Sequence, residues 1–168
     1  CRFYIWVFRG TPLLVQLFVV FYGLTRVGIT IDPFPAAVLV FSLNEGAYCA
    51  EIIRAALESV PPGQLEAGYC VGMSYLQIMR RIILPQAMRT AFPSLSNSLI
   101  AMVKDTSLAA NITVVEMFRA TQQINARVYE PLALYIEVGL IYLLFSTVLT
   151  WLQRVGEKKL GAYESREV

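Results

Sequence analysis

The chain has 168 residues, of which 57% are hydrophobic and 15% are charged, and its mean hydropathy is +0.57. Ordinary soluble domains carry about 25% charged residues, so a soluble protein of this size would lack the polar surface needed to cover its core. The sequence contains no histidine, which excludes histidine metal ligands and histidine general bases, and its three cysteines lack the paired spacing of a disulfide framework.

Four segments, taken in chain order, are apolar enough to predict membrane-spanning helices, each of which needs about 20 mostly apolar residues. The fourth is the most uniformly apolar, and the first is interrupted by Arg9 and Gln16. The fourth segment also disfavours the alternative of a soluble, all-helical protein. We therefore predict an all-α integral membrane protein with a single transmembrane domain over residues 1–168. The predicted spans are 12–24 (with an extension back to residue 3), 36–57, 92–115 and 132–152, and the predicted connections are 25–35, 58–85 and 119–131.

Lysines and arginines are distributed unequally between the two sides of the predicted bundle. Of the 14, ten lie on the side of the 58–85 connection and of both sequence ends, three lie on the other side, and Lys104 falls within a span. Cytoplasmic loops are enriched in these residues, so we expect the 58–85 connection and both sequence ends in the cytoplasm. The ten are Arg2, Arg9, Arg54, Arg80, Arg81, Arg89, Arg154, Lys158, Lys159 and Arg166, and the three are Arg26, Arg119 and Arg127.

The 58–85 connection is a polar, glycine-punctuated insert between apolar segments. Near its start it contains Pro61-Pro62-Gly63, which stops the second span. We expect one short helix over residues 64–79, in which Gly68 and Gly72, four residues apart, lie on one face and let another backbone approach. An interfacial helix without a partner is the alternative. The motif reads Glu66-Ala67-Gly68, three residues, Gly72, nine residues, Ile82, one residue, Leu84-Pro85.

This spacing resembles the EAA loop through which permease subunits of bacterial ABC importers dock onto their ATPase. Three further runs resemble the polar-amino-acid permeases of the histidine and glutamine importer type, and residues 84–87, 95–98 and 104–110 look most similar to the cystine-type members. The resemblance implies the MetI-like permease fold with a cytoplasmic coupling helix. That fold usually has five spans, so we expect one more span before the four seen here. The three runs are Arg9-Gly10-Thr11-Pro12 with Gln16, Asn44-Glu45-Gly46-Ala47-Tyr48, and Lys104-Asp105-Thr106-Ser107-Leu108.

The resemblance also implies partners and a location. An external binding protein would deliver a polar amino acid to two permease subunits in the bacterial cell membrane, where ATPase subunits would drive import by alternating access. The sequence has no GxxxxGK[ST] loop. We therefore expect no enzyme activity and no cofactor on this chain, with ATP and Mg²⁺ bound by the ATPase, and we expect no nucleic-acid partner. The expected coupling residues are Glu66, Ala67, Gly68, Gly72, Ile82, Leu84 and Pro85.

Polar residues inside the predicted spans are candidates for the substrate pathway, because a charge at the bilayer centre costs about 2.5–3.5 kcal/mol on insertion scales. The run at 104–107 favours a helix that is broken or faces a cavity. A structural role is the alternative, in which Lys104 and Asp105 neutralise one another. Glu51 and Arg54 are expected to form a structural ion pair. The candidate pathway residues are Asn44, Glu45, Ser96, Asn97, Lys104, Asp105, Thr106 and Ser107.

Two other functions use the same buried charges. A secondary transporter or channel would need no ATPase, but it is often marked by an internal repeat, which we do not find. A membrane-embedded enzyme with Glu45, Glu51 and Asp105 as acids is disfavoured, since the carboxylates show no metal-ligand spacing. The sequence leaves open which amino acid is carried and whether the second permease subunit is an identical chain.

Overall fold

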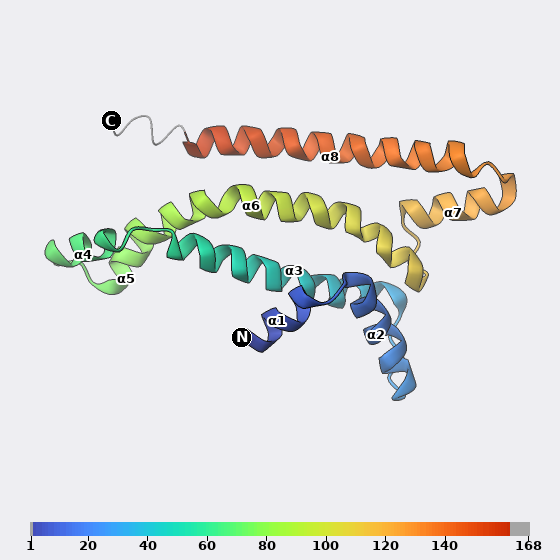
Figure 1. The fold of residues 1–168 in the computed structure, drawn as a ribbon, viewed down its shortest axis with the longest axis horizontal. Helices are drawn as coiled ribbons and strands as arrows, with labels where there is room; N and C mark the ends of the chain where they lie inside the picture. Colours follow the sequence, from blue (N-terminus) through green and yellow to red (C-terminus); the bar gives the residue numbers. More distant parts are fainter. Residues whose placement is uncertain (1, 162–168) are drawn as a thin grey trace.

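The computed structural model describes residues 2–161, and every regular element within that range is helical (Figure 1). Three long helices form the body of the molecule: α3 (Pro33–Glu58), α6 (Leu84–Asp105) and α8 (Pro131–Gly161). Helix α6 lies between the other two and packs against both (Figure 1). The short helices α4 (Pro62–Cys70) and α5 (Tyr75–Ile78) project from one end of this body.

The first predicted span is bent. Helices α1 (Arg2–Gly10) and α2 (Leu13–Arg26) meet at 104°, so the predicted extension back to residue 3 does not continue the axis of residues 12–24. The cause is local, because Pro12 at the N-terminus of α2 has no N–H for a continuous helix. Helix α2 alone has 14 residues and is about 21 Å long, less than a hydrocarbon core.

The break predicted in the third span is confirmed. Helix α6 ends at Asp105, and a 3₁₀ helix, η2 (Thr106–Ile112), replaces it. It ends at Thr113, whose φ of +68° is unusual for a β-branched residue. The predicted connection over 119–131 is mostly helical, because α7 (Met117–Val128) occupies most of it. Its N-cap is Glu116, whose carboxylate accepts bonds from the Phe118 and Arg119 amides.

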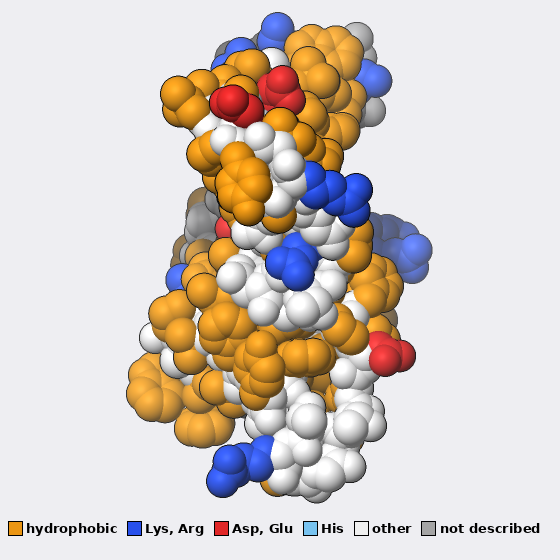
Figure 2. Space-filling model, turned by 90° about the vertical axis from the view of Figure 1, so that its right-hand side faces the viewer, with side chains coloured by type: hydrophobic (Ala, Val, Ile, Leu, Met, Phe, Trp, Pro, Cys, Tyr) orange, Lys and Arg blue, Asp and Glu red, His pale blue; other side chains and the backbone are white. Residues whose placement is uncertain are grey.

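Two helices, Pro33–Glu58 and Pro131–Lys159, are each long and apolar enough to cross a membrane, and the number rises to four among residues 2–161 if each bent pair is one span. The predicted four spans match that upper number. Helix α8 begins at Pro131, one residue before the predicted span, and leaves many large apolar side chains exposed, which suits contact with lipid. Hydrophobic side chains also cover much of the end opposite α4 and α5 (Figure 2).

Small residues allow the long helices to pack closely. Ala56 of α3 is buried against Ala87 and Ala91 of α6, and such residues let helix backbones approach inside membranes, where no hydrophobic driving force acts between helices. At the other end of α3, a larger cluster joins α2, α3 and η2. Its buried members are Leu17, Ala36, Ala37, Val40, Ala109 and Ile112.

Candidate coupling loop and transport cavities

The insert between α3 and α6 is a helical hairpin rather than one helix. Helix α4 starts at Pro62 and ends at Cys70, so the predicted continuous helix over 64–79 is wrong. Gly72 lies after it with φ +78°, its N–H donates to the Tyr69 carbonyl at 3.0 Å, and the Met73 N–H donates to the Gly68 carbonyl at 3.1 Å. This is a Schellman motif, in which glycine stops a helix because it adopts the left-handed conformation without strain.

Gly68 and Gly72 therefore have different roles. Gly68 is buried, and a Cβ there would lie 2.7 Å from Ile78 Cγ1 and 2.8 Å from Ile78 Cδ1. The close approach that was predicted for the glycine face thus occurs within the hairpin, between α4 and the fully buried Ile78 of α5. A Cβ at Gly72 would meet no atom within 4 Å, so that glycine is needed for its backbone angle alone.

The hairpin returns to the membrane through a π-helix, η1 (Met79–Ile83), that leads into α6. Ser74 and Gln77 form a capping box at the start of α5. Pro85 lies in the first turn of α6, directly after the π-turn, where a change of hydrogen-bond register accommodates a residue without an N–H. Ile82 is half-buried, whereas Leu84 and Pro85 are exposed.

The outer surface of the hairpin is apolar and uncovered. Tyr69, Val71, Tyr75 and Leu76 are between 51% and 76% exposed, although they lie outside the long apolar helices. Glu66, Ala67, Arg80 and Arg81 are also exposed, and the two arginines line a hollow of about 490 Å³ with Leu76 and Gln77. We call Tyr69, Val71, Tyr75 and Leu76 the hairpin tip. Arg80 and Arg81 were expected on the cytoplasmic side. The exposure of Val71 and Tyr75 was not expected, because one helix was predicted over 64–79.

A cavity of about 600 Å³ lies between α3, η2 and the start of α7. It is mostly apolar, with polar groups from Ser42, Glu45, Thr106 and Glu116. Two predicted pathway residues, Glu45 and Thr106, thus meet at one site, which we call the Glu45 cavity. Glu116 was not predicted as a cavity residue. The sequence shows it only as an acidic residue at the start of a helix, a common capping position.

The other polar residues of the 104–107 run face elsewhere. Lys104 and Ser107 line a second, open groove of about 500 Å³ with Phe118, Tyr135 and Tyr142. Asp105 is exposed and lines neither cavity. The break from α-helix to 3₁₀ helix therefore divides the run between two faces, which a sequence alone does not indicate. Ser96 is half-buried and Asn97 is exposed on α6, two to three turns from the break.

Asn44 has a different environment from the one predicted. It is buried, and its Nδ2 donates to Gln16 Oε1 at 3.0 Å and to the Phe8 carbonyl at 3.1 Å. Gln16 Nε2 donates to the same carbonyl at 2.9 Å, while the Thr11 hydroxyl donates to the Val7 carbonyl at 2.8 Å. Backbone groups freed by a bend at membrane depth need such partners. Asn44 therefore secures the α1–α2 bend and is not part of the lining of the Glu45 cavity, which favours a structural role for it.

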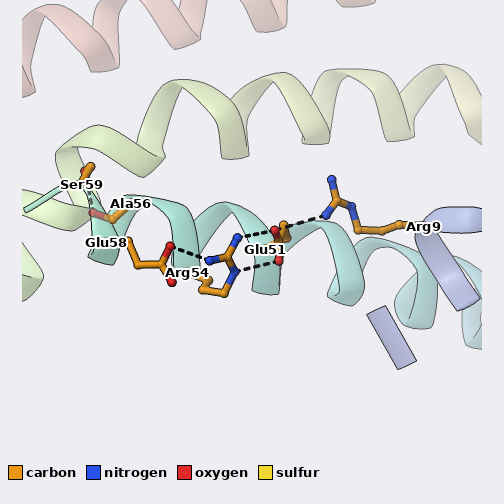
Figure 3. A network of polar contacts seen from close by, with 6 residues as sticks. All are labelled: Arg9, Glu51, Arg54, Ala56, Glu58 and Ser59. Atoms are coloured by element: carbon orange, nitrogen blue, oxygen red, sulfur yellow. Dashed lines mark hydrogen bonds and ion pairs between the residues drawn. The ribbon is translucent and has the colours of Figure 1, made fainter. Parts of the chain in front are cut away.

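The Glu51–Arg54 ion pair is confirmed and belongs to a longer chain of charges (Figure 3). Arg54 donates to both Glu51 oxygens, at 2.6 and 3.0 Å, and to Glu58 at 2.6 Å. Arg9 of α1 lies 3.5 Å from Glu51 and 5.4 Å from the centre of the Tyr48 ring. We call Arg9, Glu51, Arg54 and Glu58 the charge ladder. Two cations and two anions alternate along it, so its net charge is zero.

Comparison with known proteins shows the family. Residues 1–161 match the family described as binding-protein-dependent transport system inner membrane component. The chain belongs to this family. The L-cystine transport system permease protein TcyB of Bacillus subtilis (strain 168) is 50% identical over 164 residues, which cover 97% of this chain and 70% of that protein. The arginine transport system permease protein ArtQ of the same organism is 40% identical over 94% of this chain and 73% of its own length.

Solved structures agree. A structure described as an amino acid ABC transporter with histidines is 37% identical and superposes with a TM-score of 0.89, over 94% of this chain and 74% of that one. The MetNI methionine ABC transporter, at 18% identity and a TM-score of 0.76, shares the fold. The predicted MetI-like fold and the predicted membership of the amino-acid ABC permeases are thereby confirmed, and the chain is the permease component of an ABC importer embedded in a membrane. A permease of this kind works with an ATPase partner. Within residues 2–161 the permease contains no group of three or more metal-ligating side chains.

Proposed function

We propose that this permease carries L-cystine or a related polar amino acid into a bacterial cell, with one of two ATPase subunits docked on its hairpin tip. It would pair with a second permease subunit in the cell membrane and receive substrate from an external binding protein. ATP and Mg²⁺ would bind the ATPase, and this chain would do no bond chemistry. The observation that carries the proposal is the rigid hairpin with an uncovered apolar tip, in a chain 50% identical to an L-cystine permease.

The hairpin suits docking because its shape is fixed from within. Ile78 fills the space over Gly68, and the Schellman motif and capping box define the turn between the two helices. A patch of four large apolar side chains beyond the membrane helices is typical of a protein contact. Tyrosine and arginine are also enriched at such contacts, and Arg80 and Arg81 lie beside the tip. Glu66, Ala67, Gly68, Gly72, Ile82, Leu84 and Pro85 remain the proposed coupling residues: Gly68 and Gly72 shape the hairpin, and Ile82 to Pro85 join it to α6.

Motion of the ATPase would reach the membrane through both ends of the hairpin. One end continues into α3 and the other into α6 through the π-turn. These two helices pack closely through Ala56, Ala87 and Ala91, so displacement of the hairpin tilts them together as a rigid body. ATP binding would bring the two ATPase subunits together and open the spans outward, and hydrolysis would reverse this.

The Glu45 cavity is the proposed place for the amino acid. An amino acid is a zwitterion, so its ammonium group needs carboxylate or carbonyl oxygens. Glu45 supplies a carboxylate at a cavity that is otherwise mostly apolar, where a charge interaction is screened little. Lys104 and Ser107 lie at the same helix break on another face, and they, Asp105 at the break, and Ser96 and Asn97 on α6 are proposed to act along the route.

The docking proposal is tested with the permease co-expressed with its candidate ATPase. Leu76→Asp places a charge on the tip and should abolish co-elution of the ATPase. Leu132→Asp, at an equally exposed leucine at the start of α8, serves as the control and should retain it. Proteoliposomes should take up labelled L-cystine, arginine or histidine only with ATP present. Uptake without any ATPase would instead support a secondary transporter and overturn the proposal.

The cavity proposal is tested by Glu45→Gln in the same proteoliposomes. Uptake should fall by about 10-fold or more, since each 1.4 kcal/mol of lost interaction is tenfold, while ATPase co-elution stays unchanged. Glu137→Gln is the matched control, because Glu137 is exposed on α8 and lines neither cavity. Equal uptake by the two variants would remove Glu45 from the pathway.

A further inference from the structure

Helix α1 is fastened to α3 at three levels along its length. The Tyr4 hydroxyl donates to the Leu43 carbonyl, and a Cβ at Gly46 would lie 3.0 Å from the same hydroxyl, so the two helices approach closely there. The Phe8 carbonyl accepts from Asn44 Nδ2. The third contact is the ion pair of Arg9 with Glu51, to which the remaining ladder residues are joined (Figure 3).

The ladder runs from the α1–α2 bend to the hairpin. Arg9 is the second-last residue of α1, and Glu58 is the last residue of α3, four positions before α4 begins at Pro62. Between them, Glu51 is held by Arg9 on one side and by both nitrogens of the Arg54 fork on the other. The last turn of α3 is further fixed by the Ser59 hydroxyl, which donates to the Ala56 carbonyl at 2.8 Å (Figure 3).

Stability does not account for this arrangement. The four ladder side chains are between 26% and 65% exposed, and ion pairs at that exposure contribute little to folding. Their geometry is specific all the same, because a planar guanidinium held by both carboxylate oxygens fixes orientation as well as distance. The Arg9 side chain is fixed a second time by the Tyr48 ring.

We propose that Arg9 is a positioning residue that links the α1–α2 bend to the coupling hairpin, so that α1, the end of α3 and the hairpin move as one body during transport. This inference rests on the proposed function, since it assumes an ATPase that drives the hairpin. The proposed moving unit thus includes more than α3 and α6, which continue directly from the hairpin. It also includes α1, which contacts α3 through side chains. Helix α2, on the other side of the bend, would then be tilted by the same stroke.

The direct test is a distance measurement on the assembled importer. Spin labels are attached to cysteines introduced at Trp6, which is 71% exposed on α1, and at Gln64, which is exposed on α4, after the native cysteines are replaced by serine. The distance between the labels should be the same without nucleotide and with ATP bound. A shift of the distance distribution between the two nucleotide states would overturn the proposal. This measurement requires no substitution in the charge ladder itself.

The second test separates positioning from structure. In proteoliposomes, Arg9→Gln should lower the amount of amino acid carried per ATP hydrolysed by about 5-fold or more, the lower end of typical coupling energies, while ATPase activity and co-elution persist. Arg9→Lys, which keeps the charge, should recover part of the loss. Arg2→Gln is the matched control, since Arg2 is exposed on the same helix and none of the ion pairs among the described residues involves it.

The pair is isolated with a double-mutant cycle. Glu51→Gln should lower the amount of amino acid carried per ATP hydrolysed at least as much as Arg9→Gln does. The double variant should show no further loss relative to Glu51→Gln alone. A ratio for Arg9→Gln equal to that of Arg2→Gln, or fully additive effects, would refute the role of Arg9. If the unmodified importer shows no ATP-dependent uptake, the proposed function itself fails, and this outcome differs from a working importer that is indifferent to Arg9.

Discussion

Gly68 and Ile78 share one space at the centre of the coupling hairpin. A Cβ on Gly68 would come within 2.8 Å of two Ile78 carbons, and Ile78 is itself fully buried. Gly68→Ala should therefore force α4 away from α5, and overpacking of this kind costs about 1–3 kcal/mol. We expect a lower thermal midpoint of the purified permease and reduced ATPase co-elution.

Ile78→Ala supplies the reciprocal test of that packing. Alone it leaves a cavity, but combined with Gly68→Ala the new methyl group occupies part of the space, so the double variant should be more stable than the sum of the two single effects predicts. Gly63→Ala is the control, because a Cβ there meets nothing within 4 Å. Strictly additive effects would mean that the two residues do not compete for one space.

Substitutions at Gly72 should destabilise the hairpin through their backbone conformation rather than through the size of the new side chain. Its φ of +78° is unfavourable for residues with a Cβ, and an L-residue in the left-handed region costs about 1–2 kcal/mol. Gly72→Ala should therefore weaken the hairpin although space is available, and Gly72→Asn should do so less, since asparagine tolerates that region better. The thermal midpoint should therefore fall in the order wild type, Gly72→Asn, Gly72→Ala. An alanine variant more stable than the asparagine variant would contradict this order.

The sequence predicts the position of the hairpin but not the turn that separates Gly68 from Gly72. The position of the hairpin and its motif were predictable, because an insert with glycines and prolines contrasts with apolar spans. The turn was not, since a glycine every fourth residue fits one helix face as well as a helix that ends at Cys70. The environment of Asn44 was not predictable for a related reason. A buried amide at mid-span fits a pathway or a structural bond equally, and only the 104° bend, whose Phe8 carbonyl accepts from the Asn44 amide, favours the structural bond.

Asn44 should matter for stability and not for substrate recognition. Asn44→Ala removes the donor to Gln16 Oε1 and one donor to the Phe8 carbonyl. Interhelical hydrogen bonds in membranes contribute about 0.6–1.7 kcal/mol. Asn44→Asp should cost more, because a carboxylate would face two acceptors. The thermal midpoint should fall in the order wild type, alanine, aspartate, with Asn97→Ala, at an exposed site, close to wild type.

Transport kinetics separate the two roles of Asn44. If it only secures the bend, the amino acid concentration that gives half-maximal uptake should be unchanged in Asn44→Ala, while the amount of folded permease falls. A large rise in that concentration at unchanged stability would return Asn44 to the pathway.

Glu116 joins α7 to α8 and caps α7 at the same time. Its carboxylate accepts from the amides of Phe118 and Arg119, and from the Tyr142 hydroxyl at 3.0 Å. Loss of an N-cap costs about 0.5–2 kcal/mol, and a single hydrogen bond is worth about 0.5–1.5 kcal/mol. Glu116→Ala should therefore lower the thermal midpoint more than Tyr142→Phe.

Tyr135→Phe is the control, because the Tyr135 ring stacks on Phe118 and its hydroxyl makes no bond among the described residues. If Tyr142→Phe were as damaging as Glu116→Ala, the bond between the helices rather than the cap would hold α7 in place, and Glu116 would face the cavity mainly as a support for α8.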